Sequence, residues 1–253
     1  MSPRNLSIAV LLTSLVGSIS LAISTLSALG APPIKLTDDV APVQDLIAEI
    51  DSLTTTVDQI ASSDDAYGER QGQLNRLGLQ IAILAQTIAD HETDCMLRKS
   101  APAIRHQAAL LGSAKSRTDA TMIATKLKEL RAGQESNPSV TDAEWRSLAR
   151  SGALMPILKE RSEAIRRGLR RPKDPDAESR QALMMALVSL ALHEDTHLAR
   201  TPSDQAAWQS ACLELQRQLS RTASAIKTRD KSAAEYFRMG MEACDRCHMQ
   251  FKP

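Results

Sequence analysis

Apolar residues recur three and four positions apart along nearly the whole chain after about residue 40, and this spacing most restricts the possible folds. It is the period of one face of an α-helix. Glycine is sparse, with 10 in 253 residues, and aromatic residues make up only 2%, so composition also favours helices over strands. We therefore predict an all-α fold. The segment 43–60 shows the spacing at Val43, Leu46, Ile47, Ile50, Leu53, Val57 and Ile60.

The helical segments divide into two sets joined by short connections, which favour antiparallel neighbours. The chain is long enough for one large domain or two small ones. We predict two tandem antiparallel four-helix bundles, one at 40–133 and one at 142–253, with a linker at 134–141. In the second bundle we expect helices near 142–170, 176–200, 203–226 and 229–250.

The two halves resemble each other at a shift of 102 residues without a gap. Residues 77–111 align with 179–213, so that His91-Glu92 falls on His193-Glu194 and His106 falls on Trp208. Each half shows an apolar helix, a polar His-Glu turn and a second amphipathic helix. We interpret this as a duplicated helical unit. The alternative is that two Ala/Leu-rich helices align passably without common origin.

The first 30 residues resemble a secretory signal peptide. A short basic start, "MSPRN", precedes the uncharged apolar run "LSIAVLLTSLVGSISLAISTL", and small residues at Ala28 and Gly30 supply a cleavage site. An uncleaved anchor is the alternative. We predict a periplasmic or secreted protein with no membrane contact beyond this segment. The net charge of +1 gives no sign of a nucleic-acid binder.

The last helical segment contains the motif that carries chemistry, Cys244-Asp245-Arg246-Cys247-His248. On a helix the two thiols and the imidazole share one face. C-x-x-C-H is the pattern of covalent haem attachment, with the thiols bonded to the porphyrin and the histidine on the iron. We expect one haem c, with Phe237, Met241 and Phe251 packed against it from the same helical stripe. A redox dithiol, a zinc site and a structural disulfide are the alternatives.

The stretch "YFRMGMEACDRCHMQF" resembles the last helix of class II c-type cytochromes, the cytochrome c prime group. Those proteins are four-helix bundles with C-x-x-C-H near the C-terminus, an aromatic three residues later and then usually an arginine. Here these positions hold Phe251 and Lys252. "MLRKSAPAIRHQAALL" is similar to a helix of duplicated exported relatives in planctomycete-like bacteria. The resemblance places haem only in the C-terminal bundle.

The resemblance also raises the question of the second axial ligand of the iron. Family members either leave that position empty and take NO or CO, or supply a methionine from the first helix and carry electrons. Met155, near Arg150, is the candidate here, and ordinary core packing is the alternative. His193 and His197 rank lower. We expect an electron carrier for redox partner proteins, with a gas-binding haem protein and a non-haem scaffold as alternatives, and homodimer formation is left open.

Residues 193–197, "HEDTH", match the H-E-x-x-H pattern of zinc proteases, which places two histidines one helical turn apart. The aligned first-half segment has Cys95 instead of the second histidine, and Glu214 is the only third-ligand candidate. We therefore predict that the protein is not an enzyme. Cys212 is expected to be a buried thiol, and the basic run 160–173 a solvated helix end. Steering of an acidic partner and compensation of haem propionates are alternatives for that run.

Overall fold

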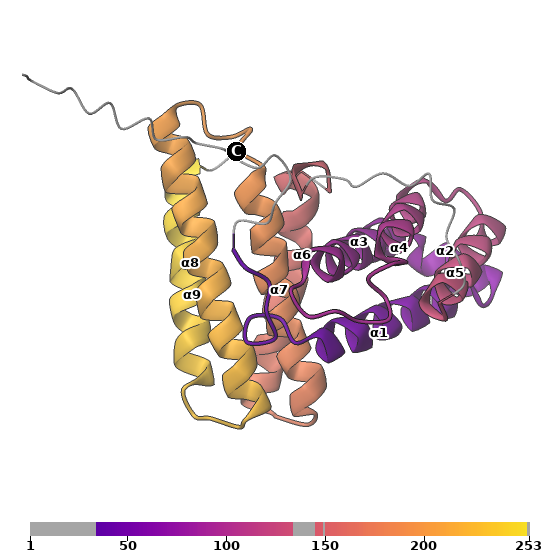
Figure 1. Ribbon diagram of the computed structural model, residues 1–253, viewed down its shortest axis with the longest axis horizontal. Coiled ribbons are helices and arrows are strands. Elements are labelled where there is room, and N and C mark those ends of the chain that lie inside the picture. Colours follow the sequence, from indigo (N-terminus) through magenta and orange to yellow (C-terminus); the bar gives the residue numbers. More distant parts are fainter. Residues whose placement is uncertain (1–33, 134–144, 149, 252–253) are drawn as a thin grey trace, which may run out of the picture.

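A computed structural model describes residues 34–133, 145–148 and 150–251 of the chain. All regular secondary structure in these ranges is helical, which confirms the predicted all-α class (Figure 1). The expected signal peptide, the linker at 134–141 and Lys252 lie outside the described residues. Within the described residues, no helix combines the length and the hydropathy that a membrane span needs.

The first group of helices covers Val43 to Arg131. Between its first two long helices lies the polar stretch 62–68. This stretch begins a short additional helix, because the Ser63 hydroxyl accepts a hydrogen bond from the Ala66 backbone N–H at 3.1 Å and caps its first turn. The group contains α1 (Val43–Ala61), α2 (Asp64–Arg70), α3 (Leu74–Asp90), α4 (Ala101–Ala109) and α5 (Arg117–Arg131), with 3-10 turns at Gln71–Gln73 and Leu110–Ser113.

The second group contains α6 (Ser151–Arg170), α7 (Pro175–Glu194), α8 (Pro202–Lys227) and α9 (Ala233–Phe251), preceded by a 3-10 turn at Trp145–Ser147. Asp174 caps α7 and Thr201 caps α8 through their side-chain oxygens. Two boundaries differ from the prediction: α6 begins at Ser151 rather than near residue 142, and α7 ends at Glu194 rather than near residue 200.

The four helices of the second group run alternately up and down beside one another (Figure 1). Backbones approach closely between α6 and α7, between α7 and α8, and between α8 and α9. Helix α7 is the most enclosed, because it packs on α6, on α8 and on the first group. Its unbroken buried run Ala182–Leu192 matches that position.

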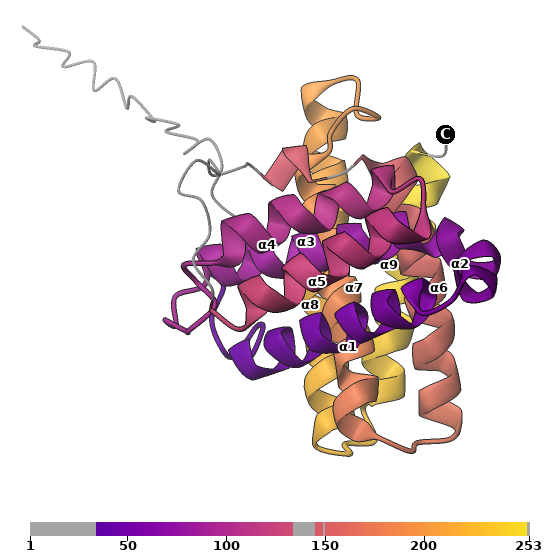
Figure 2. The same ribbon diagram turned by 90° about the vertical axis from the view of Figure 1, so that its right-hand side faces the viewer.

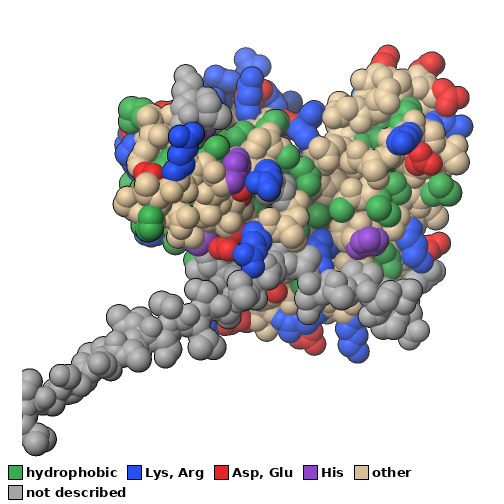
Figure 3. Space-filling model, turned by 90° about the horizontal axis from the view of Figure 1, so that it is seen from above, with side chains coloured by type: hydrophobic (Ala, Val, Ile, Leu, Met, Phe, Trp, Pro, Cys, Tyr) green, Lys and Arg blue, Asp and Glu red, His purple; other side chains and the backbone are tan. Residues whose placement is uncertain are grey.

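The first group lies crosswise on the second, against α6 and α7 (Figure 2). Its helices α1 and α3 contact α7, and α3 also contacts α6. The space-filling view from above shows the two groups as adjoining masses with positive and negative side chains intermixed on that face (Figure 3). The two halves are therefore joined by side-chain packing as well as by the chain itself.

A buried ion cluster lies where the groups meet. Glu49 of α1 pairs with Arg161 of α6 at 2.7 Å and with Arg180 of α7 at 3.4 Å. The Arg161 guanidinium also donates to the side-chain oxygens of Gln80 and Gln181, each at 2.7 Å. Glu49 and Arg161 are both buried, so their charges depend on each other.

The two His-Glu turns of the proposed repeat have different surroundings. His91 caps α3 and is fully buried, with its Nε2 3.0 Å from the Ala41 carbonyl oxygen. His193 lies in the last turn of α7, where its Nδ1 is 2.7 Å from Glu194 Oε1. Both turns follow an apolar helix and precede another helix, but the aligned histidines make different contacts.

Candidate functional site

Four helix ends meet at one end of the second group, and the C-x-x-C-H motif lies there. Helices α6 and α8 begin at this end, and α7 and α9 finish there (Figure 1). Three parts of the chain, near residues 151–155, 193–212 and 244–251, are consequently brought together. Sequence reasoning had singled out residues in all three without showing that they share one end of the fold.

Within the motif, Cys244 and Cys247 are half-buried and His248 is exposed. The buried side of α9 is formed by Ala233, Phe237, Gly240, Ala243 and Phe251. The cysteines face toward this buried side, as predicted, whereas His248 and the half-buried Met241 lie at its margin. One face of α9 thus presents two sulfurs and, beside them, an accessible imidazole.

Helix α8 forms the wall opposite the motif. The rings of Trp208 and Phe251 meet edge to face, with centroids 5.4 Å apart. The Trp208 indole N–H donates to the Leu192 carbonyl oxygen at 2.7 Å, which fixes the ring against the end of α7. Further along, a Cβ built on Gly240 would lie 3.4 Å from Gln218 Cβ, so α8 and α9 are closely apposed there.

A third thiol, Cys212 of α8, belongs to this site. Its side chain is buried, as predicted from the sequence. Burial raises the pKa of Cys212 strongly, and the nearby sulfurs of Cys247 and Cys244 raise it further. Burial, followed by the charges of Cys247 and Asp245, also raises the pKa of Cys244 to about 12. Cys212 lies one turn after Trp208, whose ring contacts Phe251 of the motif helix, so it is near the motif.

Sequence analysis missed this cluster. The cysteines that influence Cys212 are Cys244 and Cys247, on the following helix. All four cysteines lie in the described part of the chain and are free thiols. The available signal was the position of Cys212 on an apolar stripe of the helix before the motif helix.

The H-E-x-x-H stretch does not form a helical pair of histidines, and the expectation of a helical context was wrong. Helix α7 ends at Glu194, so His197 lies beyond it. The helix ends here because buried Asp195 turns back to accept a hydrogen bond from the Ser151 backbone N–H at 2.5 Å. His197 Nδ1 is also 2.6 Å from Asp195 Oδ1. In the residues described, no three His, Cys, Asp or Glu side chains are grouped as a metal site.

Met155 lies in the second turn of α6, at the same end of the group as the motif, and is half-buried. Arg150, the residue paired with it in the sequence analysis, is exposed at the start of α6. Phe237, lower on α9, is buried beneath the Arg166 guanidinium, which lies 5.9 Å from the ring centroid. This side-chain contact links α6 to α9. In the described part of the chain, the backbones of these two helices are not closely packed.

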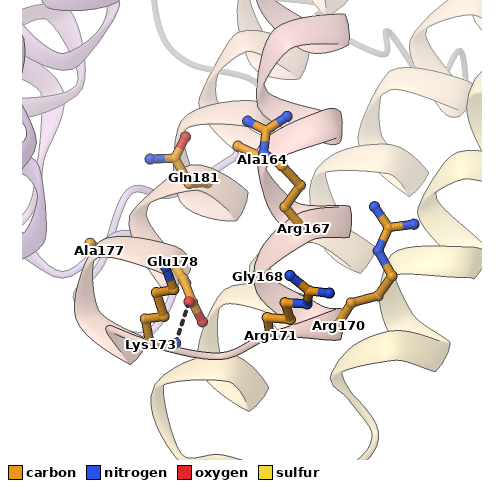
Figure 4. A pocket seen from close by; sticks show the side chains of 9 residues that line it. All are labelled: Ala164, Arg167, Gly168, Arg170, Arg171, Lys173, Ala177, Glu178 and Gln181. Atoms are coloured by element: carbon orange, nitrogen blue, oxygen red, sulfur yellow. Dashed lines mark hydrogen bonds between the residues drawn. The ribbon is translucent and has the colours of Figure 1, made fainter.

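A cavity of about 640 Å³ lies at the opposite end of α6 and α7 (Figure 4). Arg167, Arg170, Arg171 and Lys173 line it, and Glu178 accepts a hydrogen bond from the Lys173 backbone N–H at 2.8 Å. At about 1.5 Å per residue, Arg170 is roughly 28 Å along α6 from Ser151. These basic side chains are therefore far from the motif, which makes them unsuited to compensating haem propionates there.

The donor atoms at the motif end suit a covalently attached haem. Two thiols one turn apart and the next imidazole are the groups that C-x-x-C-H uses for two thioethers and an iron ligand. The half-buried sulfurs lie beside the buried Trp208–Phe251 pair, so the surroundings of the motif are apolar. The residues present therefore fit the group by chemistry and by their common location.

Comparison with known proteins identified no similar family, protein or structure. No protein-family model matches the chain, and neither a curated protein nor a solved structure is significantly similar to it.

Proposed function

We propose that the protein is an exported monohaem c-type cytochrome that carries single electrons between redox partner proteins. The observation that supports this most is the placement of Cys244, Cys247 and His248 on one face of α9, where four helix ends converge. In this proposal the second helix group is a haem-carrying four-helix bundle of the class II cytochrome type. The first group is a haem-free bundle, and residues 1–30 direct export.

Each residue of the site has a distinct part in this proposal. Cys244 and Cys247 would hold the haem through thioethers and His248 would bind its iron, and the bound haem would supply one-electron redox chemistry. The exposed position of His248 leaves its imidazole free to turn toward the metal. Trp208 and Phe251 shield one side from water, which influences the reduction potential of a haem.

The distal ligand distinguishes an electron carrier from a gas-binding protein. Met155 is half-buried on the first helix of the group and at the motif end, which favours the electron carrier. If Met155 is the sixth ligand, the reduced protein is low-spin, and Met155→Leu converts it to a high-spin form that binds CO. A wild-type protein that is already high-spin and binds CO would support the gas-binding function instead.

Haem attachment itself is tested by producing the exported chain in cells that contain the cytochrome c maturation machinery. We expect the denatured protein to stain for haem and to have the mass of the mature chain plus one haem. A Cys244→Ser/Cys247→Ser double variant should lose both signals, whereas Cys95→Ser should keep them. A correctly exported wild-type chain without added mass would exclude the cytochrome and leave a non-haem helical scaffold.

A further inference from the structure

Helix packing places Cys212 opposite one particular cysteine of the motif. Trp208 of α8 and Phe251 of α9 are in contact at the top of this helix pair. Cys212 lies one turn after Trp208, and Cys247 lies one turn before Phe251. Because the two helices are antiparallel, both steps lead in the same direction along the pair. Cys212 and Cys247 therefore lie at the same level.

Helices α8 and α9 pack closely along their length. Below the cysteines, a Cβ at Gly240 would be 3.4 Å from Gln218 Cβ. Disulfides need a Cβ–Cβ separation of about 3.5–4.5 Å, and α8 and α9 come that close at Gly240, about two turns below the cysteines.

We infer that, in the haem-free exported chain, Cys212 and Cys247 form a disulfide that joins α8 to α9. The bond withholds one of the two haem-attachment thiols until it is reduced. The effect of this disulfide on haem attachment rests on the proposed function. Formation of the disulfide itself requires no haem. Once Cys247 is part of a thioether, Cys212 remains a free thiol beside the attached group.

The reaction is a thiol–disulfide exchange with an external disulfide, such as oxidised glutathione or an oxidised dithiol protein. The half-buried Cys247 sulfur first attacks the external disulfide and releases one thiol. Cys212 then attacks the Cys247 sulfur of the mixed disulfide and releases the second thiol. Two electrons and two protons pass to the external disulfide, and one S–S bond forms in the protein.

Trypsin separates the three cysteines of the cluster onto different peptides. Cleavage after Arg200, Arg217, Arg238 and Arg246 places Cys212 in 201–217, Cys244 in 239–246 and Cys247 in 247–253. Cys95 falls in 77–98. Each candidate disulfide therefore gives a cross-linked peptide pair of its own mass, which mass spectrometry under non-reducing conditions identifies directly.

The test uses the exported full chain from cells that lack the maturation machinery, equilibrated with oxidised glutathione, alkylated and digested. We expect the pair 201–217 with 247–253 to predominate and to disappear on reduction. Three alkylated thiols, or a predominant Cys244–Cys247 bridge, would overturn the inference. Cys95→Ser is the matched control and should leave the cross-link unchanged.

A second measurement links the bond to haem loading. After oxidation, the wild-type chain should need a reductant before it attaches haem in a maturation assay. The increase in haem attachment caused by the reductant should be at least several-fold smaller for Cys212→Ala. Circular dichroism checks that the variant is folded. If the bridge forms but no chain ever attaches haem, the proposed function fails and the disulfide stands. If haem attaches but no bridge forms, the inference fails and the cytochrome stands.

Discussion

At the scale of single residues, the scarce aromatic side chains are concentrated on the two helices that form the candidate site. Of the six aromatic residues in the sequence, four lie on α8 and α9: Trp208, Tyr236, Phe237 and Phe251. Large rings exclude water over a wide area for few residues. Trp208 also forms a hydrogen bond, because its indole N–H donates to the buried Leu192 carbonyl oxygen at the end of α7. It couples α7, α8 and α9 at the motif.

Trp208→Phe should therefore destabilise the protein by about 1–3 kcal/mol, because the buried Leu192 carbonyl loses its indole donor. Urea unfolding followed by circular dichroism measures this difference. Tyr67→Phe is a matched control, because the Tyr67 hydroxyl lies 3.5 Å from the Ala114 carbonyl oxygen, a long hydrogen bond. Its cost should be smaller, and equal costs would contradict the role assigned to the indole.

At the scale of elements, sequence reasoning succeeded where the cause is local. The apolar period located most helices, including α8, which was expected at 203–226 and spans Pro202–Lys227. It failed where a residue distant in the sequence determines where a helix ends. Helix α7 ends at Glu194, and the next residue, Asp195, accepts a hydrogen bond from the Ser151 backbone N–H, 44 residues away. The position of Cys212 was missed for a similar reason: its burial follows from helical spacing, but the cysteine opposite it depends on how α8 and α9 are aligned in space.

Helix α5 has a local capping box that makes a pH-dependent contribution to stability. The Asp119 carboxylate accepts hydrogen bonds from the backbone N–H groups of Lys115 at 3.0 Å and Ser116 at 3.1 Å. These bonds lower the pKa of Asp119 below 3.8, the Lys115 bond most. A lowered folded-state pKa stabilises the protein above the unfolded value, and this contribution is lost as pH falls through the folded value.

Asp119→Asn should accordingly be less stable than wild type at pH 7, and the difference should shrink as pH falls below about 3.8. Urea unfolding at a series of pH values from 7 to 2 tests this. Ser116→Ala removes the other half of the box and should cost about 1 kcal/mol at pH 7. A constant difference between Asp119→Asn and wild type over the series would contradict the prediction.

At the scale of the whole molecule, the ion cluster around Glu49 indicates what the first helix group does for the second. Glu49 comes from α1, whereas Arg161 and Arg180 belong to α6 and α7, the helices that carry Met155 and His193. Lys227 of α8 adds a second link, to Asp45 of α1 at 2.7 Å. The first group thus supplies counter-charges that the second needs at its contact face. We expect the halves to depend on each other for stability.

Glu49→Gln tests this dependence. It leaves the buried Arg161 guanidinium and the Arg180 guanidinium without their carboxylate, and loss of one member of a buried ion pair costs about 3–5 kcal/mol. Asp51→Asn, on the same helix, breaks an exposed pair with Arg131 and should cost about 1 kcal/mol or less. Urea unfolding followed by circular dichroism compares both variants with wild type. Similar small losses would mean that the Glu49 cluster does not stabilise the contact between the two helix groups.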